Sequence, residues 1–169
     1  MKRLLNIACM LAIGSGAALA QTAGGEVAAK NRDAAAAFVA TQNFIVGRLG
    51  RDCLAQIGRS ETPLEYQTKW QTDNAPYYGA ATKYMDARLA EIENAEERDA
   101  VERAYYASVQ KTAEAALNRQ FSNGSKDDVC KYAMTLVDTG SMNIEEFGKA
   151  NKLPIMQDLQ ELVAWSKTK

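Results

Sequence analysis

The placement of two cysteines constrains the fold of this chain more than any other feature of its sequence. Cys53 stands in the stretch "RDCLAQIG" and Cys130 lies far downstream in "KDDVCKYAM". This separation matches neither a C-x-x-C redox motif nor the closely spaced ligand pairs of structural zinc. We therefore predict a structural disulfide, which should stabilise the fold by about 4–5 kcal/mol because it closes a long loop.

The first residues predict the oxidising compartment that such a disulfide needs. A basic start precedes an apolar run from Leu4 to Ile13, which contains the third cysteine, Cys9, and small residues follow as far as Ala20. This layout is typical of a cleavable export signal, so we expect residues 1–20 to be removed and the protein to be periplasmic or secreted. A membrane anchor is the alternative, but the run is only about half as long as a bilayer-spanning helix.

The composition argues against several function classes. The chain contains no histidine, so a Ser-His-Asp triad, a Cys-His pair and the histidine-rich site of catalytic zinc are excluded. The 20 basic and 21 acidic residues form no basic block, which argues against nucleic acid as a partner. The stretch "AGGEVA" lacks the Lys-Ser or Lys-Thr ending of a phosphate-binding loop. We predict no metal, no cofactor and no membrane insertion after signal cleavage.

Helix-forming residues dominate the rest of the chain. Only three prolines occur, and Ala, Glu, Lys, Gln and Leu fill the long segments, whereas the alternating pattern of β-strands is missing. We predict an all-α fold, a single-domain bundle of about six helices. The domain should span residues 26–166, after a flexible lead at residues 21–25, and the Cys53–Cys130 disulfide should join its N-terminal and C-terminal thirds.

Start and stop signals divide this domain into helices. The first helix is expected from about Glu26 to Leu49, with Gly47 and Gly50 weakening its end. Further helices should begin at Pro63, near Asn94, after Ser125, after Asn143 and at Pro154. The helix that follows Asn94 should reach Phe121 and bury one apolar stripe, formed by Val101, Tyr105, Val109, Ala116 and Leu117.

The clearest start signal is "TPLE". Thr62 can cap the helix, Pro63 fits the first helical position, and Glu65 can return a hydrogen bond to the cap. The same arrangement is predicted at Ser125 with Asp128 and at Asn143 with Glu146. Further along, Pro76 disfavours helical geometry at the residue before it, so we expect a break or a kink there.

A cluster of aromatic residues around that break is the candidate binding site. Its aromatic members are Tyr66, Trp70, Tyr77 and Tyr84, and Asn74 beside the break belongs to the same candidate site. Trp70, Tyr77 and Tyr84 would share a face if one helix continued through the break, and rings with polar tips suit stacking on sugars or anchoring a protein partner. The alternative is that these rings belong to the core, as aromatic residues at helical spacing usually do, and that Asn74 caps the following helix.

These features predict a small, non-enzymatic protein of the periplasm that binds a protein partner, as an inhibitor, an immunity protein, an adaptor or a chaperone-like protein. No catalytic residue is predicted, because Glu65, Asp128 and Glu146 have capping roles and the other acids resemble surface charge. Two alternatives stay open. One is a carboxylate-dependent hydrolase of cell-wall material, and the other is a carrier of a small apolar ligand inside the bundle.

Overall fold

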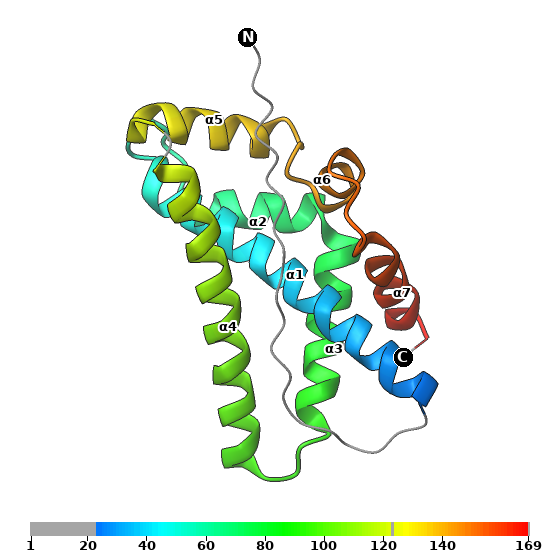
Figure 1. The fold of residues 1–169 in the computed structure, drawn as a ribbon. Coiled ribbons are helices and arrows are strands. Elements are labelled where there is room, and N and C mark those ends of the chain that lie inside the picture. Colours follow the sequence, from blue (N-terminus) through cyan, green and yellow to red (C-terminus); the bar gives the residue numbers. More distant parts are fainter. Residues whose placement is uncertain (1–22, 123, 169) are drawn as a thin grey trace.

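The structure, a computed structural model, describes residues 23–122 and 124–168, so the predicted export signal and its cleavage site after Ala20 lie outside the described residues. Within these ranges the chain forms seven helices and no strand, and the prediction of an all-α bundle is confirmed. The helices, shown in Figure 1, are α1 (Ala23–Cys53), α2 (Pro63–Asp73), α3 (Ala75–Ala90), α4 (Ala95–Phe121), α5 (Lys126–Asp138), α6 (Ile144–Ala150) and α7 (Met156–Ser166).

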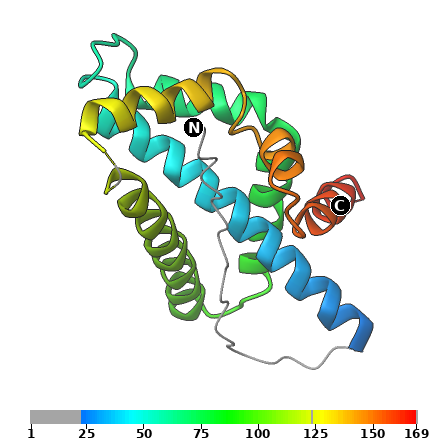
Figure 2. The same ribbon diagram turned by 45° about the horizontal axis from the view of Figure 1, so that its top comes forward.

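Helix α1 is the central element of the bundle. It packs against α2, α3, α4, α5 and α7, and the two views in Figures 1 and 2 show it crossing the middle of the molecule. Its buried side chains, such as Ala36, Val39, Val46 and Leu49, cover one broad face. A helix with several neighbours needs a wide apolar face, and small alanines let those neighbours pack closely.

Helix α1 is longer than predicted at both ends. It begins at Ala23, so residues 23–25 of the predicted flexible lead are helical, and it continues through two glycines to Cys53. A Cβ atom at Gly50 would lie 3.2 Å from Cα of Pro63, and one at Gly47 would lie 2.8 Å from Nε2 of Gln67. These glycines therefore allow the close approach of α2, and the packing outweighs their low helix propensity.

The predicted capping box at the start of α2 is confirmed. The Thr62 hydroxyl accepts a hydrogen bond from the Glu65 amide at 3.2 Å, and the Glu65 carboxylate accepts one from the Thr62 amide at 2.7 Å. These bonds to the carboxylate lower the pKa of Glu65. The Ser125 hydroxyl caps α5 in the same way, by accepting from the Asp128 amide at 3.2 Å.

The predicted break before Pro76 is also confirmed. Helix α2 ends at Asp73, Asn74 caps its C-terminus, and α3 begins at Ala75 with proline in its first turn. Figure 1 shows the two helices running in different directions. The binding-site residues before and after Asn74 therefore do not lie along one continuous helix.

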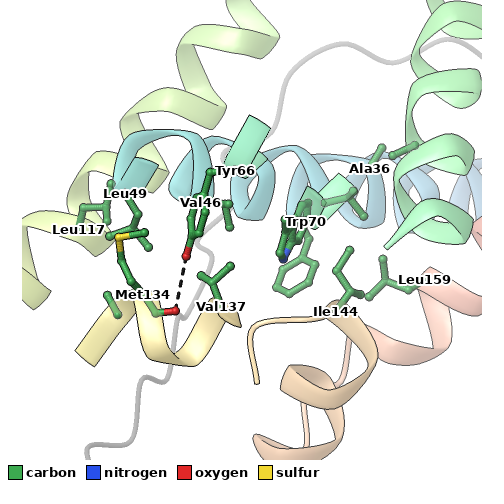
Figure 3. Close-up of a cluster of buried hydrophobic side chains, with 14 of the residues drawn as sticks. Ala36, Val46, Leu49, Tyr66, Trp70, Leu117, Met134, Val137, Ile144 and Leu159 are labelled. Carbon is green, nitrogen blue, oxygen red and sulfur yellow. Dashed lines mark hydrogen bonds between the residues drawn. The ribbon is translucent and has the colours of Figure 1, made fainter. Parts of the chain in front are cut away.

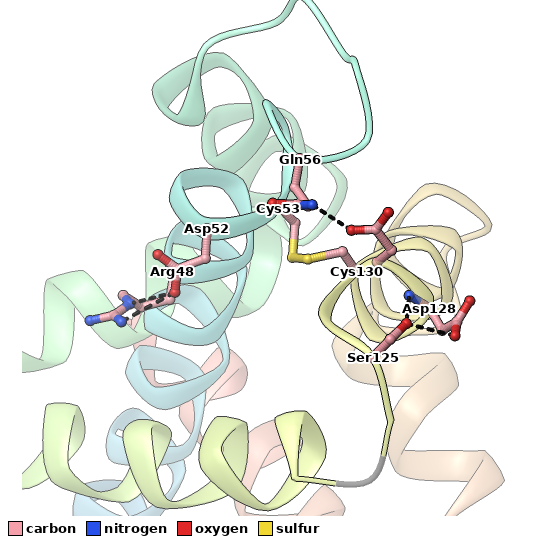
Figure 4. Close-up of a disulfide and its surroundings, with 8 residues drawn as sticks. Arg48, Asp52, Cys53, Gln56, Ser125, Asp128 and Cys130 are labelled. Atoms are coloured by element: carbon pink, nitrogen blue, oxygen red, sulfur yellow. Dashed lines mark hydrogen bonds and ion pairs between the residues drawn. A yellow bond between two sulfur atoms is a disulfide. The ribbon is translucent and has the colours of Figure 1, made fainter.

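The disulfide forms as predicted. Cys53 and Cys130, 77 residues apart, are bonded to each other and fully buried. Figure 4 shows the bond joining the last turn of α1 to the start of α5, next to a hydrogen bond between Gln56 and Asp127. The covalent bond closes a loop that contains α2, α3 and α4. Because both cysteines are buried, the two ends of this loop are anchored in the core.

The first half of α4 contributes less to the core than its sequence predicts. Val109, Ala113 and Leu117 are the buried residues of this helix, whereas Val101 is 43% exposed and Tyr105 is half-buried. The prediction of a buried Val101 is therefore wrong. Figure 1 shows why: the start of α4 extends with the end of α3 away from the helices that enclose the rest of the core.

Candidate functional site

The predicted site residues lie in two groups, and all of them except the half-buried Tyr77 are buried. Tyr66, Trp70 and Asn74 belong to the interior between α1, α2, α5 and α6. Tyr77 and Tyr84 lie two turns apart on α3, which packs against α7, and each of them lines a separate surface pocket. The structure thus does not gather the five residues into one site.

The rings of Tyr66 and Trp70 lie in the hydrophobic core, as Figure 3 shows. Trp70 is 1% exposed, and its indole N–H donates a hydrogen bond to the carbonyl of Met142 at 3.1 Å. The Tyr66 hydroxyl makes a longer contact of 3.5 Å with the carbonyl of Met134, and burial raises the pKa of this phenol. The Trp70 N–H and the Tyr66 hydroxyl thus hold α2 against the C-terminal third of the chain. Neither ring is exposed enough to contact a partner.

Asn74 is buried and joins three segments of the chain. Its Nδ2 donates to the carbonyl of Trp70 at 2.8 Å and to Oδ1 of Asn143 at 3.2 Å, and its Oδ1 accepts from the amide of Ile144 at 2.7 Å. Asn74 therefore satisfies an amide at the start of α6, whereas its side chain does not cap α3. The predicted capping of α6 by Asn143 with Glu146 is wrong, because the side chain of Asn143 makes no cap bond.

The first pocket surrounds Tyr77, a half-buried residue of α3. The pocket has a volume of about 240 Å³, and its apolar lining comes from Pro76, Val163 and Ala164. Polar side chains form the rest of its lining, contributed by Glu145, Gln160 and Lys167. Desolvation raises the pKa of the Tyr77 phenol and the Glu145 charge adds to the rise. The hydroxyl, protonated at neutral pH like that of any ordinary tyrosine, can donate a hydrogen bond.

The second pocket, with a volume of about 400 Å³, lies over Tyr84 between α1, α3 and the end of α7. The Tyr84 ring meets the Trp165 ring edge to face, with 5.2 Å between their centroids. Its hydroxyl donates to Oδ1 of Asp33 at 2.7 Å. Burial, followed by this hydrogen bond and by the charge of Asp33, raises the pKa of the phenol. Ala29 and Ala87 complete the apolar part of the lining.

Charged side chains form the remainder of the second pocket, namely Arg32, Lys83, Arg88 and Glu91. Arg88 pairs with Glu91 at 2.6 Å and lies 3.8 Å from Asp33, while Lys83 donates to the carbonyl of Ser166 at 2.9 Å. Sequence reasoning missed these residues. They are ordinary surface charges of α1 and of α3 with its C-cap, and no local pattern marks their convergence.

Arg32 differs from the other cations of this pocket. Its guanidinium carbon lies 5.9 Å from the centroid of the Tyr84 ring, a cation–π distance. Its Nε is buried and has no hydrogen-bond partner in the described part of the chain. Buried polar atoms are nearly always paired, so such an atom calls for an explanation.

Two further properties bear on possible activities. Within residues 23–122 and 124–168, no group of three or more His, Cys, Asp or Glu side chains is placed so that it could hold a metal ion. In the same ranges, no helix combines the length and the apolar character needed to cross a membrane. Comparison with known proteins adds no assignment, since no family model, curated protein or solved structure matches this chain.

Proposed function

We propose that this chain is an exported, non-enzymatic binding protein, and that it recognises an envelope protein through the Tyr77 pocket. Export is supported by the basic and apolar N-terminal layout and by a buried disulfide, since disulfides persist in oxidising compartments. The binding role is supported by one observation above all. Tyr77 is a residue of the predicted aromatic site that remains partly accessible, and it lies in a pocket on the surface.

The lining of the Tyr77 pocket defines the kind of contact it favours. Apolar side chains from α3 and α7 can receive an apolar side chain of the partner, and Glu145, Gln160 and Lys167 offer polar groups around it. An apolar centre surrounded by polar residues is typical of protein interfaces, and tyrosine is enriched among the residues that dominate their affinity. The proposed partner is therefore a protein that inserts one apolar side chain next to Tyr77.

A crosslinking experiment identifies the partner without relying on capture alone. A photoreactive amino acid is placed at the exposed Gln160 of the exported protein, and at the exposed Gln110 on α4 as a control. The proposal expects one protein to crosslink from position 160 and not from position 110. Crosslinks that are equal at both positions, or absent from position 160, contradict it.

The energetic role of Tyr77 is tested with that purified partner. We expect Tyr77→Ala to weaken binding about tenfold or more, because truncating a central interface tyrosine removes upwards of about 1.4 kcal/mol. Tyr132→Ala, at the 56% exposed tyrosine of α5, is the matched control and should leave the affinity unchanged. If both variants bind like the unmodified protein, the Tyr77 pocket is not the binding site.

A further inference from the structure

Among the described residues, the pocket over Tyr84 has more cationic than anionic side chains. Its carboxylates are already engaged: Glu91 pairs with Arg88 at 2.6 Å, and Asp33, at its edge, accepts from the Tyr84 hydroxyl at 2.7 Å. Arg88 also lies 3.8 Å from Asp33, so three cations face two carboxylates here and one positive charge is left over. Lys83 donates to a neutral backbone carbonyl, and Arg32 stacks over a neutral ring. The surplus charge in the pocket is positive.

Arg32 has the donor that an anion would satisfy. A guanidinium carries five N–H donors in a planar fork and matches a carboxylate with two parallel hydrogen bonds. Here the Nε donor is buried without a partner among the described residues, and the guanidinium lines the pocket. An anionic group that entered beside the Tyr84 ring would therefore meet the guanidinium, and it would reach Nε only if the side chain turned toward the pocket.

The rest of the pocket favours a ligand that is more than a bare anion. Trp165, Ala29 and Ala87 contribute apolar surface to its lining beside the charged residues. A volume of about 400 Å³ lies in the range of pockets for small organic molecules, which combine an apolar lining with a few polar anchors. Inorganic phosphate would leave this apolar surface without a contact.

We propose that the Tyr84 pocket binds a small organic carboxylate with an apolar body, that Arg32 and Lys83 hold its carboxylate, and that its body packs on Trp165. The site is separate from the Tyr77 pocket, because the two pockets share no lining residue. If the Tyr84 pocket binds no carboxylate, the proposed protein binding at the Tyr77 pocket is unaffected. If the Tyr77 pocket binds no protein, the carboxylate proposal is likewise unaffected.

The test compares a carboxylate with its neutral isostere. Phenylacetate and phenylacetamide are titrated into the disulfide-bonded protein, and binding is followed by calorimetry and by the NMR signal of the Trp165 indole. We expect phenylacetate to bind at least about tenfold more tightly than phenylacetamide and to shift the Trp165 signal, because only the carboxylate forms an ion pair with Arg32 and accepts two parallel hydrogen bonds from it. N-acetylphenylalanine, titrated in parallel, distinguishes the carboxyl end of a polypeptide from a free acid as the source of the ligand.

Variants assign the effect to Arg32. Arg32→Gln should weaken phenylacetate binding about tenfold or more, whereas Arg98→Gln, an exposed site on α4, is the matched control and should not change it. Lys83→Gln provides a second, solvent-exposed test if the first variant does not fold. Equal affinity for the acid and the amide, no loss of affinity in Arg32→Gln and Lys83→Gln, or no shift of the Trp165 signal would each overturn the proposal.

Discussion

Asn74 shows how one polar side chain can organise a small helical core. It is 2% exposed, yet it has partners for both its donor and its acceptor, on α2 and at the start of α6. The amide of Ile144, which it satisfies, belongs to a residue with no exposed surface. A buried amide without a partner is costly, so the position of α6 depends on this asparagine.

We therefore predict that Asn74→Ala lowers the free energy of unfolding by about 1–3 kcal/mol, because it leaves the buried amide of Ile144 without its acceptor. Urea denaturation of the disulfide-bonded protein measures this change. Asn151→Ala is the matched control, because the side chain of Asn151 is exposed and bonds only within its own turn of helix. A loss at Asn74 no larger than the loss at Asn151 would show that solvent satisfies this amide.

At the scale of the elements, a glycine allows α6 to approach the start of α7. Gly148 is buried, and a Cβ atom at this position would lie 1.9 Å from Sδ and 2.8 Å from Cγ of Met156. Two atoms of one half-buried side chain would have to move, so a larger residue at position 148 requires Met156 to adopt another rotamer. The close contact between α6 and the start of α7 therefore depends on glycine, which has no Cβ atom, at position 148.

Gly148→Ala should destabilise the protein by about 1–3 kcal/mol, the usual effect of overpacking. Gly79→Ala makes the same change inside α3, where no atom lies within 4 Å of the added methyl group. There we expect a gain of about 0.5–1 kcal/mol, because alanine favours the helix. Thermal and urea unfolding of the two variants measure the difference, and changes of the same sign would contradict this account of the α6–α7 contact.

For the whole molecule, the disulfide is a covalent connection between distant parts of the chain. It joins the end of the central helix α1 to α5, over a sequence separation of 77. A crosslink over such a loop restricts the unfolded chain far more than the folded one. Its removal should therefore reduce stability without changing the helical fold.

We expect the double variant Cys53→Ala/Cys130→Ala to lose about 4–5 kcal/mol of unfolding free energy. Alanine suits these positions because both side chains are fully buried. Chemical denaturation of the variant, and of the unmodified protein with and without reductant, measures the loss. If reductant has no effect on the unmodified protein, or if the variant matches the oxidised form, the bond does not stabilise the fold in this way.

Much of the fold could be predicted from the sequence because its signals are local. The caps at Thr62 and Ser125 and the proline after Asn74 act on backbone groups within one turn, so helix starts and breaks appear in the residues themselves. The disulfide was predictable for another reason. Two cysteines that match no motif for redox or zinc chemistry are expected to pair in an oxidising compartment.

The sequence by itself thus determined the helical class, most helix boundaries and the covalent link between Cys53 and Cys130. Only the tertiary structure decided that α1 passes through its glycines, that Asn74 caps α6, and that Arg32 meets Tyr84 and Trp165 in one pocket. The physical reason is the range of the interactions. Caps and breaks depend on neighbours within a turn, whereas close packing, burial and the convergence of charges depend on residues that only the folded chain brings together.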